Sequence, residues 1–208
     1  MNLYLFNDND SAAIYGIGTY LNELSYALKD SGVNIHIVNL RSVSRKFEII
    51  KVNQIEYWNI PEVGNYNLSI ESTENYFRNV VYILRIHIKD TKNLIFHFNY
   101  NHSQIMAKEL KKIFDCKTVA IIHLIKWQLD HYGNLKKLYL LKSKPEKQKT
   151  SSEKNMLFNY EYENILFTEV DRLVALSEHT KKILEIEHKI DPRKIVFIPN
   201  GLDNNYFS

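Results

Sequence analysis

Two glycines stand one residue apart at the start of an apolar-periodic helix, in residues 14–24, IYGIGTYLNEL. In open α/β sheets, ligands bind beyond the carboxyl ends of the strands. A helix that begins there offers an anion free N–H groups and a positive dipole end. Gly16 and Gly18 would allow a close backbone approach. Leu21 replaces the third glycine of the dinucleotide fingerprint, and no P-loop lysine follows. A tight turn without a ligand therefore explains the pattern equally well.

Two histidines point to the same edge. His97 in IFHFN and His123 in AIIHL fall near the carboxyl ends of expected strands, where the glycine turn also lies. A histidine there could hydrogen-bond a sugar hydroxyl or a phosphate, or move a proton. The alternative is an imidazole satisfied by backbone at a strand end. We treat the other histidines as surface or packing residues and expect no metal site, because there is no HExxH motif.

The elements that must position these residues alternate along the chain. Short apolar runs that predict buried strands occupy residues 3–6, 35–40, 94–99, 118–124, 172–177 and 194–200. Helical spacing of apolar residues occupies residues 17–30, 75–89, 103–114, 156–170 and 178–188, with Ser103 and Ser177 at expected N-caps. The alternation predicts an α/β fold: a Rossmann-like, doubly wound and mainly parallel sheet with helices on both faces.

Two further segments interrupt this alternation. Residues 46–60 predict a hairpin-like excursion, and residues 136–150, rich in lysine and broken by Pro145, predict a mobile loop. Six lysines in residues 135–149 flank several leucines, so a short helix there would suit an anionic membrane surface. A solvated loop whose leucines pack on the domain is the simpler interpretation.

Composition limits the class of protein. The 208 residues are 45% hydrophobic with a net charge of +3, which predicts one globular domain and does not favour nucleic acid as a partner. The single cysteine, Cys116, excludes an internal disulfide, and the first ten residues lack the pattern of a signal peptide. We expect a cytoplasmic protein, with the inner face of the membrane as a candidate peripheral contact.

Both ends of the chain resemble one family. Residues 15–40, YGIGTYLNELSYALKDSGVNIHIVNL, are similar to the opening of the N-terminal domain of GT-B glycosyltransferases of the family 4 type. EVDRLVALSEHTKKIL and the following KIVFIPNGLD resemble the end of that domain, where Asp171, Ser177 and PNGLD match in order and distance. Glu163 stands eight residues before Asp171, as in many members.

The resemblance implies half of a retaining enzyme. Residues 1–200 would form the acceptor-side Rossmann-like domain, and residues 201–208 the start of a linker to a C-terminal donor-binding domain outside this chain. The enzyme would move a sugar, as a hexosyltransferase, from a nucleotide-sugar to a glycan or lipid-linked acceptor in polysaccharide biosynthesis. It would need no metal or cofactor beyond the nucleotide-sugar co-substrate. These 208 residues alone would be inactive.

The resemblance also implies site roles. His123 matches the catalytic histidine that contacts the transferred sugar, and His97 matches a more variable cleft position. Gly16 and Gly18 match the turn that faces the donor diphosphate and the acceptor. Thr19 stands at the substrate-binding position where many members have arginine.

Two alternatives stay open. One is a non-catalytic Rossmann-like module that uses the same cleft to bind a nucleotide, a sugar or a protein partner. The other is a split glycosyltransferase whose donor half is a separate polypeptide.

Overall fold

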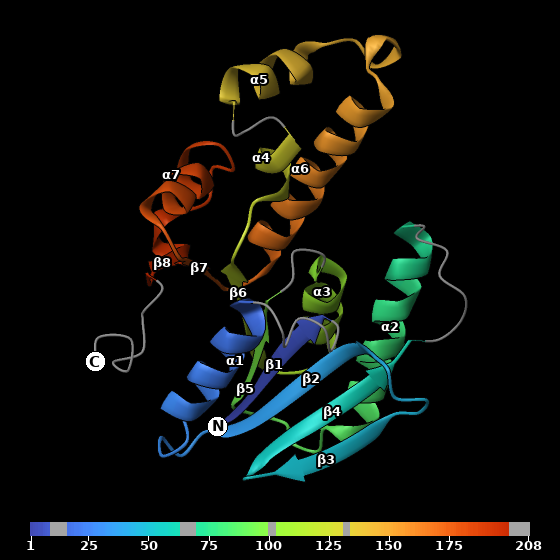
Figure 1. Ribbon diagram of the computed structural model, residues 1–208, viewed down its shortest axis with the longest axis vertical. Helices are drawn as coiled ribbons and strands as arrows, with labels where there is room; N and C mark the ends of the chain where they lie inside the picture. Colours follow the sequence, from blue (N-terminus) through green and yellow to red (C-terminus); the bar gives the residue numbers. More distant parts are fainter. Residues whose placement is uncertain (9–15, 63–69, 100–102, 131–133, 200–208) are drawn as a thin grey trace.

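The computed structural model of the chain describes residues 1–8, 16–62, 70–99, 103–130 and 134–199. Within them the centre is an eight-stranded sheet, ordered β3-β4-β2-β1-β5-β6-β7-β8 and parallel except at β3 (Figure 1). The strands are β1 (Asn2–Asp8), β2 (Asn34–Ser42), β3 (Glu48–Val52), β4 (Ile55–Pro61), β5 (Leu94–Phe98), β6 (Cys116–Ile122), β7 (Arg172–Ala175) and β8 (Ile195–Phe197). The helices are α1 (Gly16–Ala27), α2 (Ile70–His87), α3 (Gln104–Ile113), α4 (Lys126–Asp130), α5 (Leu135–Ser143), α6 (Ser151–Glu169) and α7 (Glu178–Ile186).

Helices cover both faces of the sheet, as predicted. On one face, α1 packs over β1 and β2 around a small apolar cluster that includes Leu5, Leu21 and Ile37. On the other face, α2, α3, α6 and α7 contribute to a much larger core, to which Phe77 and Leu184 belong. The chain turns from β1 toward β2 and later returns to β5 on the other side of β1, so the strand order reverses between β1 and β5. Such a reversal is the usual ligand position in a doubly wound sheet.

The six predicted strands and five predicted helices are all present, displaced by a few residues at their ends. The predicted hairpin over residues 46–60 is the antiparallel pair of β3 and β4. Ser177 caps α7 by accepting a hydrogen bond from the Thr180 amide. Ser103 occupies the N-cap of α3, but its side chain makes no capping hydrogen bond to that helix.

The prediction of a mobile loop over residues 136–150 is wrong, because most of this segment is helical. Asn134 caps α5 by accepting a hydrogen bond from the Lys137 amide. Leu138 and Leu141 are buried on the side of α5 that packs toward α6. The run of charged lysines and Pro145 favour a solvated loop, yet Leu138 and Leu141 have helical spacing and a core to bury against.

A buried aromatic cluster fastens α4, α6 and the end of α7. Trp127 Nε1 donates to His188 Nε2 at 3.1 Å, and the Tyr160 ring stacks on the imidazole with centroids 4.7 Å apart. Because Nε2 accepts this bond, His188 is neutral, and its Nδ1 faces Asn164 Oδ1 at 3.4 Å. Burial, followed by the charge of Lys142, lowers the pKa of His188 to about 4. His188 is thus a packing residue of the interior.

Candidate functional site

The two glycines lie inside the first turn of α1. Gly16 is the first helical residue and is exposed, Gly18 is buried, and Thr19 is exposed. A Cβ built on Gly16 would meet nothing within 4 Å, so no packing contact among the described residues requires glycine there. The preceding residues 9–15 lie outside the described part of the chain. Amides of a first helical turn have no partner within the helix, so this end of α1 presents donors and a positive dipole end.

His97 and His123 come together beneath α1, on adjacent strand ends. Tyr20 of α1 contacts both: its hydroxyl lies 3.5 Å from His97 Nε2, and its ring centroid is 5.4 Å from that of the His123 imidazole. Asn99, directly after β5, holds His123 through a 3.2 Å contact between Asn99 Oδ1 and His123 Nε2. The pair lies beside the reversal between β1 and β5. The structure therefore places the two histidines side by side; their chemical roles stay predictions.

Hydrogen bonding assigns the protons of His123. The Asn99 side-chain amide donates to the Phe6 carbonyl, so its oxygen is the atom that faces His123. The contact then requires Nε2 of His123 to carry the proton, which leaves Nδ1 as the acceptor. A neutral imidazole in this tautomer can accept a hydrogen bond from a substrate hydroxyl at Nδ1.

Burial keeps both histidines uncharged. It lowers the pKa of His97 to about 3, and the neighbouring His123 adds to that shift. Burial also lowers the pKa of His123. The same desolvation raises the pKa of Tyr20 to about 12, so its hydroxyl keeps its proton. At neutral pH the three side chains form a neutral hydrogen-bonding group, which can orient hydroxyls but supplies no positive charge.

A ladder of amide side chains crosses the same face of the sheet. Asn7, Asn39 and Asn59 are paired in register across β1, β2 and β4. Asn7 donates to Asn39 at 3.3 Å, and Asn39 donates to Asn59 at 2.9 Å. Asn59 donates to Glu48 on β3, whose carboxylate also accepts from the Ser44 hydroxyl. In this ladder each amide donates to the next side chain in the same direction, from β1 across β2 and β4 to β3.

Glu163 and Asp171, the two acidic residues of the family resemblance, stabilise the strands and helices around the site. The Glu163 carboxylate, 2% exposed, accepts a hydrogen bond from the Lys126 amide at 2.6 Å and so caps α4, just after His123. Asp171 accepts from both the amide and the hydroxyl of Thr118, each at 2.8 Å, which ties the start of β7 to β6. Burial opposes ionisation of Asp171, but these two bonds and the charges of Lys111 and Lys117 together lower its pKa. Both residues hold strands and helices in place. Neither belongs to the group of His97, His123 and Tyr20.

Sequence reasoning missed the asparagines and Tyr20. A signal was present, because Asn7, Asn39 and Asn99 each follow a buried apolar residue near the end of a strand. Whether these asparagines share one face of the sheet depends on the register of the strands, which cannot be read from the sequence. In the described part of the chain, no group of three or more His, Cys, Asp or Glu side chains is placed to hold a metal ion.

The comparisons with known proteins bear on the family and the fold of the chain. The chain matches the family model of Glycosyltransferase Family 4 over residues 14–206. No curated protein matches it significantly. Among solved structures it is similar to a sucrose-phosphate synthase from Thermosynechococcus elongatus, with a TM-score of 0.66 and 14% identity over 97% of this chain and 48% of that one.

A second similar structure is an α,α-trehalose-phosphate synthase (UDP-forming) from Burkholderia vietnamiensis, with a TM-score of 0.59 and 9% identity over 97% of this chain and 48% of that one. The chain thus spans about half the length of these solved structures. Both are GT-B glycosyltransferases, and at these identities the likeness establishes the fold. The chain belongs to Glycosyltransferase Family 4 and has the Rossmann-like fold of a GT-B N-terminal domain.

Proposed function

We propose that residues 1–200 are the acceptor-side domain of a retaining hexosyltransferase that moves a sugar from a nucleotide-sugar to a glycan or a lipid-linked acceptor. The observation that carries the proposal is the neutral group of His97, His123 and Tyr20 at the strand-order reversal, in a chain that belongs to a glycosyltransferase family. Residues 201–208, outside the described part, would begin the linker to a donor-binding domain.

The neutral state of His97 and His123 determines which catalytic roles this domain can fill and which fall to the donor-binding domain. His123 would accept a hydrogen bond from a hydroxyl of the transferred sugar at Nδ1, while Asn99 holds its ring through Nε2. Because burial keeps both histidines neutral, they cannot balance the charge of a leaving diphosphate. That charge would fall to the amides of the first turn of α1 and to basic groups of the donor-binding domain. We propose no metal and no cofactor.

The acceptor-side role suits a cytoplasmic enzyme of polysaccharide biosynthesis that can approach a membrane. Tyr139 and Leu140 of α5 are 52% and 69% exposed, beside the exposed Lys136 and Lys137. A patch of this kind binds anionic lipid weakly and reversibly. No helix of the described residues is long and apolar enough to cross a bilayer. We therefore include a peripheral contact through residues 135–149 in the proposal.

The test measures nucleotide release and sugar transfer from a panel of nucleotide-sugars. The chain is assayed alone and together with the donor-binding half, supplied either on the same polypeptide or as a separate subunit. We expect transfer only in the second case, with the anomeric configuration of the donor retained in the product. Robust transfer by the chain alone, or an inverted product, would contradict the proposal. Nucleotide-sugar or glycan binding with no transfer in either case would favour a recognition module.

A further inference from the structure

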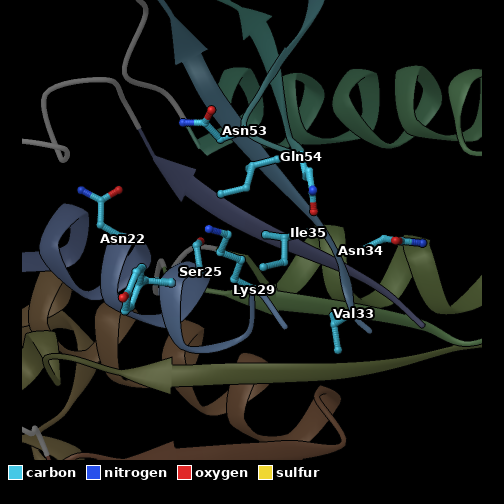
Figure 2. Close-up of a pocket in the computed structure, with 10 residues that line it drawn as sticks. Asn22, Ser25, Lys29, Val33, Asn34, Ile35, Asn53 and Gln54 are labelled. Atoms are coloured by element: carbon cyan, nitrogen blue, oxygen red, sulfur yellow. The ribbon is translucent and has the colours of Figure 1, made fainter. Parts of the chain in front are cut away.

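A groove follows the side of α1, on the face of the sheet that this helix covers. Its end nearest the turn between β3 and β4 has a volume of about 440 Å³. Figure 2 shows Asn53 and Gln54 of that turn on one side of the groove, Asn22 and Ser25 of α1 on the other, and Ile35 between them. A volume of this size suits a small ligand.

The groove continues toward the carboxyl ends of the strands. Asn22 also lines a second hollow, of about 180 Å³, that reaches Asn7 and Gly18. Asn39 and Tyr57 line both this hollow and a third one, of about 540 Å³, over the outer hairpin. The shared lining residues make the three hollows neighbours on this face, and together we treat them as one groove. It runs from the β3–β4 turn to the first turn of α1.

The groove is longer than a single sugar ring. Ile55, Tyr57 and Asn59 of β4 line the three hollows in turn, and from Ile55 to Asn59 the strand extends for about 13 Å at its usual rise. The end near Asn7 is the end that lies beside the helix terminus of the candidate site. A ligand that fills the groove would therefore reach the candidate site with one end only.

The lining is rich in hydrogen-bonding groups and carries a single charge. Among the described lining residues Lys29 alone is charged, and no carboxylate is present. Amides such as those of Asn22, Asn53 and Gln54 offer donors and acceptors together, which matches the dual character of a sugar hydroxyl. The exposed ring of Tyr26 offers an apolar surface for the face of a sugar ring.

Two buried polar atoms of the lining have no hydrogen-bond partner among the described residues. They are Asn7 Oδ1 and Ser25 Oγ, whose residues are 4% and 3% exposed. An unpaired buried acceptor or hydroxyl costs free energy, and its persistence needs an explanation. They lie in the two hollows that share Asn22, an exposed side chain that can move aside. A ligand hydroxyl in each hollow would then supply the missing bond.

We propose that this groove binds an extended, uncharged oligosaccharide, so that the acceptor of the enzyme is a growing glycan of several sugar rings. This inference rests on the proposed acceptor-side function and adds the class and length of the acceptor. The end of the glycan that receives the sugar lies near Asn7 and the first turn of α1. The earlier rings extend along β4 toward Asn53 and Gln54.

The experiment measures binding without any nucleotide-sugar. Glycan-array screening and then calorimetry compare the 208-residue chain with neutral oligosaccharides of one to six hexose units, α- and β-linked, and with matched uronic-acid oligosaccharides. The variants are Asn22→Ala and Gln54→Gly. Gln54 has a φ of 70°, so glycine suits the turn while the side chain is lost. Asn79→Ala, an exposed asparagine on α2 beyond the other face of the sheet, is the matched control.

We expect a neutral oligosaccharide to bind, with an affinity that rises with length over at least about three rings. Asn22→Ala and Gln54→Gly should each weaken binding of the long glycan by about fivefold, as expected for one lost hydrogen bond. Asn79→Ala should leave it unchanged. Binding of uronic-acid glycans only, affinity independent of length, equal affinity of all variants, or no binding to any neutral member would each overturn the inference. Because no donor is present, these outcomes do not depend on whether transfer occurs.

Discussion

Acid should destabilise this chain through two buried neutral histidines. His97 and His188 are 7% and 5% exposed, and burial lowers their pKa values to about 3 and about 4. The unfolded chain binds these protons with a pKa of about 6.5. The folded-state pKa lies below the unfolded value, so the stabilising contribution is complete above pH 6.5 and is lost as the pH falls.

The size of the effect follows from proton linkage. At pH 5 each unfolded histidine binds nearly one proton that the folded chain does not bind, compared with about a quarter of a proton at pH 7. Integration over that interval gives a loss of about 2 kcal/mol in the free energy of unfolding for each histidine, about 4 kcal/mol for the two. Such a loss is a large fraction of the stability of an ordinary domain.

The assay is urea unfolding at several pH values between 7 and 5, followed by circular dichroism. His188→Gln keeps an acceptor for Trp127 and cannot become charged, so its loss over this range should be about 2 kcal/mol smaller than that of the wild type. His97→Gln should behave likewise. His179→Gln, which removes an exposed histidine, is the control and should follow the wild type. If His188→Gln and the wild type lose stability in parallel, the buried neutral state of His188 is refuted.

Three other variants test the framework and the proposed membrane contact. Thr118→Val removes the hydroxyl that bonds Asp171 and should cost about 1 to 3 kcal/mol in urea unfolding; an unchanged midpoint would show that this tie is dispensable. Asn39→Leu removes the centre of the amide ladder and takes the acceptor from the buried Asn7 amide and the donor from the half-buried Asn59 oxygen, so the free energy of unfolding should fall by about 2 kcal/mol, whereas no loss would deny the ladder a structural role. Reversing the charges of Lys136 and Lys137 should weaken binding to anionic vesicles at least about tenfold, in a vesicle co-sedimentation assay. Absence of wild-type binding, or binding that survives both the reversal and high salt, would remove the membrane from the proposal.

Most of the fold could be predicted because its signals are local. Apolar runs such as LIFHF and the helical spacing of residues 75–89 each identify an element without knowledge of its neighbours. The alternation of strands and helices then favours a parallel sheet. The helix within residues 136–150 is harder to predict, because it depends on burial of Leu138 and Leu141 in the core beside α6, a contact that composition does not reveal.

The site could be predicted in part, for a related reason. His97 and His123 were identifiable because each stands near the end of a strand, and the edge of a parallel sheet is common to all its strands. The contact of Tyr20 with the two histidines depends on the rotation of α1 about its own axis over the sheet. The amide ladder depends on the register that pairs Asn7 with Asn39. Helix rotation and strand register are tertiary properties, so these contacts emerge only from coordinates.

The most direct test of the central claim is the kinetic effect of His123→Ala in the protein that joins this chain to a donor-binding domain. If the imidazole bonds the transferred sugar mainly in the transition state, kcat should fall at least about tenfold, because one such hydrogen bond contributes about 1.4 kcal/mol. The KM for the nucleotide-sugar should stay near the wild-type value. Asn99→Ala removes the side chain that holds the His123 imidazole, so it should also lower kcat, but by a smaller factor. An unchanged kcat in His123→Ala would contradict the account and leave the histidine as a packing residue at a strand end.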